Sequence, residues 1–328
     1  MPTFCRHNRF VDSCPICSRK ELVRPGTVSG AAGMRRATAD KPATRRRPQR
    51  AGDLVVRRVA RAEDDGYEND LAPGLRSSED ARRLAGELAW AAARLQELRG
   101  YPPGLLARAA AMDDREEALW LVFLIAYLSP LEDVGDPFAA IEAAHTSWAS
   151  GELPELDDVP LGPRAAHAAG RGPETLLAYR SRAEKAGGQL ALLSGEAALT
   201  PARRFERAFE RLALPRMNRA ARYEFLLLAG GLGLIDAQPS SLLFGVEATD
   251  PATMAAKRVF GIGDAINLQR RATELVTACD VAPGALDLAL VNWARGLEDR
   301  ITAGSDVAVD PAAVALLETA LGLETSPG

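Results

Sequence analysis

The chain has few aromatic residues, few cysteines and no long apolar run. Aromatic side chains make up 5% of its 328 residues, and strand-favouring runs of Val, Ile and Thr are scarce. Ala, Leu and Arg are plentiful instead, so the composition predicts helices. The longest apolar run, residues 119–128, is shorter than the roughly 20 residues that span a bilayer. Residues 1–20 carry cysteines and charges where a secretory signal has an apolar core. We therefore expect a soluble, cytoplasmic protein with no membrane partner.

Three of the four cysteines lie within the first 17 residues. Cys14-Pro-Ile-Cys17 is a Cys-x-x-Cys knuckle, in which two thiolates can bind one tetrahedral metal ion. Cys5 and His7 can supply the other two ligands from a short turn. Four ligands leave no open coordination position, so we predict one structural zinc ion. The alternatives are free thiols or a redox pair, and the redox reading lacks the strand that precedes a thioredoxin-like motif.

The composition changes after residue 20. Residues 21–77 lack helical periodicity, and a basic first part gives way to an acidic second part. These features predict a disordered linker between a zinc-binding module, residues 1–20, and a helical domain, residues 78–328. The basic part either attracts phosphate groups or serves as a solvated tether, and the sequence leaves both readings open.

Helix signals dominate from residue 78 onward, and no convincing sheet and no repeat of fixed period is present. Caps, prolines and apolar patterns predict helices over about 78–98, 104–112, 113–128, 137–148, 173–186, 201–212, 218–232, 239–244, 251–259, 264–279, 284–294 and 311–321. The predicted fold class is therefore all-α.

Two of these predicted helices flank a Gly-x-Gly turn. The first ends just before Gly261-Ile262-Gly263, and Asp264 begins the second. Helix, turn and helix in this order are typical of a helix-hairpin-helix, whose turn amides and second helix N-terminus face a DNA phosphate. On the Gly-Ile-Gly tripeptide alone, an ordinary tight turn between packed helices is the better interpretation.

An aspartate, Asp287, stands about two dozen residues beyond this turn, at the start of a further predicted helix. The layout resembles the helix-hairpin-helix DNA glycosylase superfamily, and the resemblance implies that Asp287 is the catalytic carboxylate. Upstream, an apolar helix followed by Ser-Pro130-Leu131 resembles the buried helix and wedge loop of that superfamily. It implies that Pro130 and Leu131 enter the duplex. The alternatives are a helix-dipole role for Asp287 and a core helix stopped by proline.

The zinc segment narrows the resemblance. Cys-x-His-Asn-Arg-Phe and Cys-Pro-x-Cys before a helical body resemble the third clade of the alpha-glutamyl/putrescinyl thymine pyrophosphorylase group, a branch of this superfamily associated with hypermodified phage bases. The resemblance covers the zinc head and about residues 78–300. It implies that the partner is double-stranded DNA, in particular phage DNA with modified bases.

The first functional hypothesis is a DNA glycosylase, active in bacterial anti-phage defence, that hydrolyses the N-glycosidic bond of a flipped-out modified base such as a hypermodified pyrimidine. Asp264-Ala265 replaces the lysine of bifunctional relatives, which favours a monofunctional hydrolase. Cys279 stands alone, so no iron–sulfur cluster is expected. Glycine-rich residues 230–233 follow a helix rather than a strand, so no nucleotide cofactor is expected. Weaker candidates for a base pocket are Glu132, Asp133, Arg222 and Tyr223.

Two further hypotheses remain open at this stage. One is a base-modifying pyrophosphorylase that replaces a pyrophosphate on an activated thymine in DNA. The other is a non-catalytic DNA-binding adaptor that contains zinc. The sequence does not identify protein partners.

Overall fold

The computed structural model describes residues 62–245 and 249–324, which belong to one compact unit that begins near residue 57. Every regular element among these residues is helical, which confirms the all-α prediction for this part of the chain. No helix among them is long and apolar enough to cross a membrane. The predicted zinc ligands Cys5, His7, Cys14 and Cys17 lie outside the described residues.

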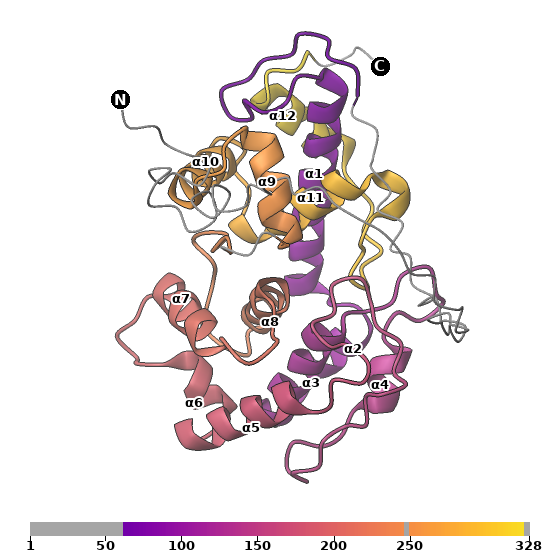
Figure 1. Ribbon diagram of the computed structural model, residues 1–328, viewed down its shortest axis with the longest axis vertical. Coiled ribbons are helices and arrows are strands. Elements are labelled where there is room, and N and C mark those ends of the chain that lie inside the picture. The colour runs from indigo at the N-terminus through magenta and orange to yellow at the C-terminus, as the bar shows by residue number, and fades with distance from the viewer. Residues whose placement is uncertain (1–61, 246–248, 325–328) are drawn as a thin grey trace, which may run out of the picture. The chain divides into compact units, whose positions relative to one another are not determined.

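The helices follow one another along the chain, with a long irregular segment at residues 145–173 (Figure 1). In chain order they are α1 (Ser78–Gly100), α2 (Gly104–Ala110), α3 (Arg115–Leu128), α4 (Ala139–Ala144), α5 (Glu174–Ala186), α6 (Gln189–Ser194), α7 (Pro201–Arg211), α8 (Arg219–Gly231), α9 (Pro251–Phe260), α10 (Ala265–Ala278), α11 (Pro283–Arg295), the 3₁₀ helix η3 (Leu297–Asp299) and α12 (Pro311–Ala320). The expected helix over 239–244 is not formed, and that over 137–148 shortens to α4.

The helices pack as two groups that meet at α1 and α8. In one group, α1 contacts α11 and α12, and α9 contacts α10 and α11. In the other, α3 contacts α2, α6 and α8, and α7 contacts α6 and α8 (Figure 1). Contacts between α1 and α8 join the groups. The last residues of α3, from Ala118 to Leu128, are all buried, as expected for a helix that is apolar on every side.

An aromatic cluster forms the centre of the second group. The Phe123 ring stacks on Tyr179 with 4.0 Å between ring centroids and meets Phe225 edge-on at 5.4 Å. Trp120 stacks on Phe123 at 5.6 Å. These rings come from α3, α5 and α8, so aromatic packing fixes the position of α8.

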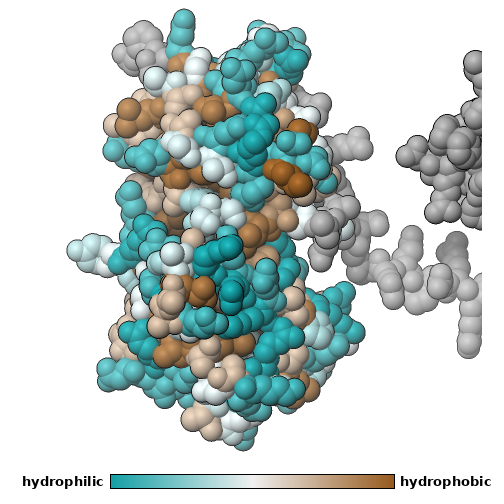
Figure 2. All heavy atoms as spheres, turned by 90° about the vertical axis from the view of Figure 1, so that its left-hand side faces the viewer, coloured by the Kyte–Doolittle hydropathy of each residue, from teal (hydrophilic) through white to brown (hydrophobic). Residues whose placement is uncertain are grey.

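The surface carries scattered rather than continuous apolar side chains. On the face shown in Figure 2, hydrophobic residues are interspersed among hydrophilic ones. Large exposed apolar residues, such as Ile266 at 80% and Leu316 at 73%, come from different helices. Isolated apolar residues of this kind are common on protein surfaces.

Residues 62–77 differ from the predicted linker of residues 21–77. Tyr67 donates a hydrogen bond from its hydroxyl to the Leu321 carbonyl at 2.6 Å, and the Gly74 amide donates to the Val259 carbonyl at 2.9 Å. Ala72 and Leu75 are buried. A Cβ on Gly74 would lie 2.1 Å from the Arg258 carbonyl oxygen, so only glycine permits this approach. The acidic composition of residues 62–77 suggested a solvated linker. A few buried residues and hydrogen bonds instead hold this segment against the helices.

Candidate functional site

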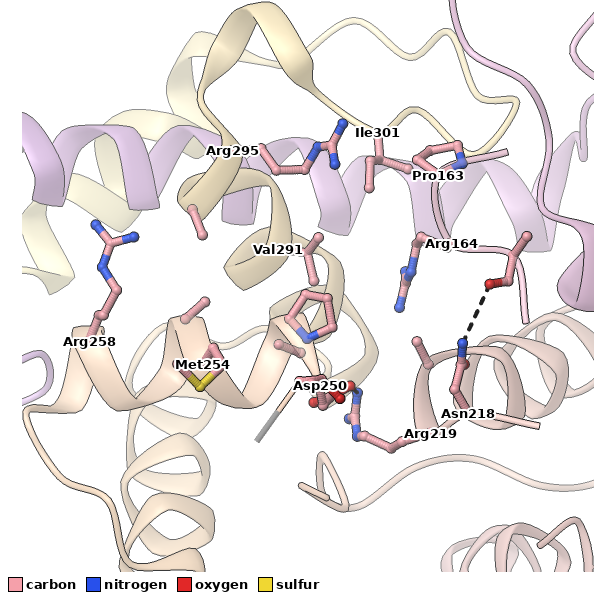
Figure 3. Close-up of a pocket in the computed structure, with 17 residues that line it drawn as sticks. Pro163, Arg164, Asn218, Arg219, Asp250, Met254, Arg258, Val291, Arg295 and Ile301 are labelled. Carbon is pink, nitrogen blue, oxygen red and sulfur yellow. Dashed lines mark hydrogen bonds and ion pairs between the residues drawn. The ribbon is translucent and has the colours of Figure 1, made fainter. Parts of the chain in front are cut away.

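A pocket of about 360 Å³ lies between the two helix groups (Figure 3). Its walls come from the loop at residues 163–165, the start of α8, α9 and α11. Met254, Val291 and Ile301 form an apolar part of the wall. The charged residues of the lining are Arg164, Arg219, Arg258, Arg295 and Asp250. Small-molecule sites commonly measure about 300–1,000 Å³ and combine apolar walls with a few polar groups, so this pocket has the size and composition of a ligand site.

Two of the lining arginines are held from behind by Asp287 on α11. Arg219 Nη1 lies 2.5 Å from Asp287 Oδ1, and Arg164 Nη2 lies 2.7 Å from Asp287 Oδ2. The Asp287 side chain is 1% exposed. Burial raises the pKa of Asp287, but Arg219 and Arg164 outweigh burial and bring that pKa below its ordinary value. Asp287 therefore remains an anion that fixes two guanidinium groups.

Glu224 of α8 extends this arrangement to α1. Its Oε1 accepts a hydrogen bond from Arg94 Nη2 at 2.6 Å, and its Oε2 lies 3.3 Å from Arg164 Nη1. Burial lowers the pKa of Arg164, but Asp287 and Glu224 outweigh burial and leave it raised. Each of these charges is buried with an opposite charge beside it, which limits the free-energy cost of its burial.

Arg219 has further partners that fix its direction. Its Nε donates to the Leu243 carbonyl at 3.0 Å, and another of its nitrogens donates to the Leu242 carbonyl. The guanidinium carbon lies 4.8 Å from the centre of the Tyr223 ring. Because Arg219 is 2% exposed and contacts several groups, it presents a rigid edge to the pocket.

Asp250 is the one carboxylate among the described residues that line the pocket. It is the N-cap of α9, and its Oδ2 accepts hydrogen bonds from the Thr253 amide at 2.9 Å and the Thr253 hydroxyl at 2.6 Å. Its Oδ1 lies 3.8 Å from Arg219 Nη1, which is too far for a hydrogen bond. We use the name ion network for Arg94, Arg164, Arg219, Glu224, Asp250 and Asp287.

The remaining lining arginines lie toward the other end of α9 and α11 (Figure 3). The Arg258 guanidinium carbon lies 4.7 Å from the centre of the Trp293 ring, and Arg295 donates from Nε to the Asp299 carbonyl at 2.8 Å. Four arginines and one aspartate thus line the pocket, although Asp287 and Glu224 partly balance two of them from behind. A lining with this charge attracts an anionic ligand.

Asp287, the predicted catalytic residue, lies directly behind the pocket wall rather than in the lining. Asp287 is part of the ion network. The nearby Asp280 follows α10, is exposed and has a φ of 50°. The helix-dipole alternative does not account for Asp287, because this side chain forms two buried ion pairs with arginines of other segments.

The Gly261-Ile262-Gly263 turn follows α9, so one helix joins it to the pocket. Gly261 has a φ of 64° and lies against Gly74. Gly263 and Asp264 are exposed. The Asp264 Oδ1 accepts from the Asn267 amide at 3.0 Å and so caps α10. This carboxylate occupies the helix N-terminus at which a phosphate would bind.

The predicted wedge residues lie close to the ion network but do not protrude. Pro130 is buried, and a Cβ on Gly162 would lie 2.0 Å from its carbonyl oxygen. The Leu131 amide donates to the Pro137 carbonyl at 3.0 Å. Ser129, immediately before them, has a φ of 60°, and its hydroxyl accepts from the Arg164 amide at 3.3 Å. This loop therefore supports the segment that carries Arg164.

The four weaker candidates for a base pocket are not part of the lining. Glu132 accepts hydrogen bonds from the Thr302 amide and hydroxyl at 3.0 and 2.6 Å, so it fixes a loop. Asp133 is exposed with a φ of 57°. The Arg222 guanidinium carbon lies 4.3 Å from the Phe209 ring centre. Tyr223 is buried and donates from its hydroxyl to the Ser241 carbonyl at 3.0 Å.

Most residues of the ion network were not predicted as site residues from the sequence. A recognisable signal exists for Glu224, which interrupts the apolar run of α8, and for Arg94, which interrupts that of α1. Charged residues at buried helical positions need partners. Arg164 lies in a loop without periodicity, so its sequence position carries no comparable signal.

No group of three or more His, Cys, Asp or Glu side chains that could hold a metal ion occurs within residues 62–245 and 249–324. Cys279 is buried, and burial raises the pKa of its thiol to about 11. Comparisons with protein-family models, curated proteins and solved structures found no match to this chain. Evidence for function therefore comes from the geometry of the pocket and the ion network.

Proposed function

We propose that this protein is a DNA-base-processing enzyme, a monofunctional DNA glycosylase that takes one flipped-out, modified base into the pocket between α8, α9 and α11. The observation that carries the proposal is the pocket itself, which has an apolar wall and four arginines in its lining and lies along the helix that precedes the Gly261–Gly263 turn. A base needs an apolar slot for its faces, and the adjoining phosphates need cations.

The position of the turn supports the proposal further. A helix-hairpin-helix would bind the DNA backbone through its turn, and because Asp264 caps α10, the phosphate contact would fall on the turn amides rather than on the α10 N-terminus. A base flipped from that duplex would need a pocket close to the turn in space. Arg258, on the last turns of α9, lines the pocket three residues before Gly261. One stretch of backbone can therefore serve both the phosphate contact and the base pocket.

Hydrolysis of a glycosidic bond passes through a sugar with positive charge at C1′. A carboxylate beside that carbon stabilises the charge and orients the attacking water. The ion network provides two acidic groups at the pocket, Asp250 in the lining and Asp287 behind it.

A second candidate is the replacement of pyrophosphate on an activated thymine in DNA. The specific observation in its favour is the excess of arginines in the lining, four against one carboxylate. Guanidinium groups bind phosphate oxygens in a bidentate manner and stabilise the charge that develops on such a leaving group.

Mass spectrometry of DNA treated with the purified protein separates these chemistries. The substrates are duplexes that carry a panel of modified pyrimidines. A released base with an abasic site supports the glycosylase, and an altered nucleoside in the digested DNA supports the second candidate. If neither product forms and DNA binding weakens steeply with salt, the protein is a DNA-binding adaptor. This result would overturn the enzyme proposal.

A pocket-filling variant connects the activity to this site. Ala294 lines the pocket on α11, so Ala294→Trp should abolish product formation. Ala186 is exposed at the end of α5, and Ala186→Trp is the matched control that should retain it. Equal activity in both variants would place the reaction elsewhere.

We also propose one structural zinc ion bound by Cys5, His7, Cys14 and Cys17, which lie outside the described residues. The support is the spacing of four residues, three cysteines and one histidine, of the types that bind zinc within 13 positions. Elemental analysis should find about one zinc per chain, and Cys14→Ser should lower that content while leaving helix content unchanged. A metal content that does not respond to Cys14→Ser would refute the ligand assignment.

A further inference from the structure

Two carboxylates flank Arg219, and they differ in their access to the pocket. Asp250 belongs to the lining, whereas Asp287 does not. Arg219 Nη1 lies 2.5 Å from Asp287 Oδ1 and 3.8 Å from Asp250 Oδ1. Arg219 therefore forms a hydrogen-bonded ion pair with Asp287 and a longer ion pair, without a hydrogen bond, with Asp250.

Both oxygens of Asp287 are engaged by arginines. Arg219 occupies Oδ1 and Arg164 occupies Oδ2, each at hydrogen-bond distance. For Asp287 to reach a substrate in the pocket, these arginines would have to move. Arg164 is also paired with Glu224, and Arg219 with two backbone carbonyls, so such a movement would break several buried contacts at once.

Asp250 has one oxygen occupied by hydrogen bonds and one, the open oxygen, that lies 3.8 Å from Arg219 Nη1, too far for a hydrogen bond. Thr253 donates two hydrogen bonds to Oδ2, whereas no described residue donates one to Oδ1. The occupied oxygen fixes the carboxylate at the start of α9, and the open one remains a hydrogen-bond acceptor beside the pocket. A rigid carboxylate with a free acceptor is suited to hold or deprotonate a water molecule.

We propose that Asp250 is the carboxylate that touches the substrate and that Asp287 is a positioning residue, which sets the direction of Arg164 and Arg219. This assignment rests on the proposed base-processing function of the pocket. It differs from the role that the superfamily resemblance implies for Asp287.

In hydrolysis the water oxygen bonds to C1′ while the C1′–N bond breaks, and the electron pair of that bond leaves with the base. Asp250 Oδ1 accepts one proton of the water and later returns it to solvent. The base nitrogen takes up a proton from solvent. The products are the free base and an abasic site, and no oxidant or further reactant is required.

Asparagine variants of the two residues test the assignment in full-length protein, with base release and steady-state kinetics as readouts. Asp250→Asn keeps an N-cap oxygen for the Thr253 amide, so it should fold and keep its KM while kcat falls about 100-fold or more. Asp287→Asn should raise KM and lower the Tm, because Arg164 and Arg219 lose their common anion, while a substantial part of kcat remains.

The helix cap itself needs a control, and the chain provides one. Asp310 is also an N-cap aspartate followed by proline, at the exposed start of α12. Asp310→Asn should leave kcat and KM unchanged. Serine also caps helices well, so Asp250→Ser should show the same loss of kcat. This second variant tests whether the loss comes from a folding defect specific to asparagine.

The outcomes distinguish this assignment from the proposed function. If the wild type forms no product from any modified duplex, the base-processing function fails and the assignment fails with it. If the wild type is active and Asp250→Asn keeps its kcat, the assignment alone is overturned. Loss of kcat at unchanged KM in Asp287→Asn would likewise overturn it, because that is the signature of a group acting on the substrate.

Discussion

Helices α3 and α11 are both buried, but they bury different chemistry. The buried run from Ala118 to Leu128 in α3 consists of apolar and aromatic residues. In α11 the buried residues include Asp287 and Asn292. Asp287 pairs with Arg164 and Arg219, and Asn292 exchanges hydrogen bonds of 3.1 and 3.0 Å with the Ile301 backbone.

This difference shows how the pocket is built. The rings of α3 stabilise the fold and hold α8 through Phe225, but apolar burial sets no hydrogen-bond direction for a neighbouring side chain. Buried polar groups need partners in fixed geometry. The partners of Asp287 and Asn292 are Arg164, Arg219 and Ile301, and all three line the pocket. Helix α11 therefore determines the shape of the site, and α3 supports it from a distance.

The largest effect should come from α3. Phe123 is fully buried and contacts the rings of Trp120, Tyr179 and Phe225. Phe123→Ala should reduce the free energy of unfolding by roughly 3–5 kcal/mol, because it leaves a cavity in the aromatic cluster. Urea unfolding measures this change. Tyr101→Ala is the control, since Tyr101 is 90% exposed and its loss should cost less than about 0.5 kcal/mol. A small loss for Phe123→Ala would mean that α3 is not the main apolar support.

Helix α11 should respond to substitution in a different pattern. Asp287→Leu should cost about 3 kcal/mol, because Arg219 and Arg164 lose a buried anion. Adding Arg219→Met should restore part of that loss, since replacing both members of a buried ion pair by apolar residues is often neutral. The double-mutant cycle in urea should give a coupling of about 1 kcal/mol or more. Additive costs would show that the ion pair is energetically unimportant and would remove the contrast with α3.

The sequence predicted the helices far better than the pocket. The proline and cap signals located α9, α10 and α11 within a few residues, because these signals act on neighbouring positions. The ion network depends on contacts between distant positions. Arg164 and Asp287 are 123 residues apart, and Arg219 and Asp287 are 68 apart. A single sequence contains no local signal for such pairs, so Asp287 was predicted as a site residue while its pairing with Arg164 and Arg219 was not.

The 239–244 region shows a second limit. Its proline and apolar residues suggested a helix, but the Leu242 and Leu243 carbonyls accept hydrogen bonds from Arg219 instead. Leu243 also has a φ of 49°, which no right-handed helix contains. A buried arginine from another element thus competes with the local helical preference, and the outcome depends on tertiary packing.

The smallest expected effect is a difference in the pH range over which groups near α3 and groups near α11 lose their contribution to stability. On the α3 side, Tyr127 contacts His167 Nδ1 through its hydroxyl at 3.1 Å, and burial lowers the pKa of His167. The unfolded chain then binds a proton first, near its ordinary pKa of about 6.5. Stability should therefore fall as the pH drops from about 6.5 through the lower folded pKa.

On the α11 side the folded pKa of Asp287 is also lowered, but its ordinary value is about 3.9. Its stabilising contribution is complete above that pH and is lost as the pH falls through the still lower folded pKa. Thermal unfolding from pH 8 to pH 3 measures both windows. A variant with both His167→Gln and His145→Gln should flatten the curve below about pH 6.5, because burial lowers the pKa of His145 as well. Asp287→Asn should change the slope only in the acid window, and a change near pH 6 would show that Asp287 is not held as an anion by its two arginines.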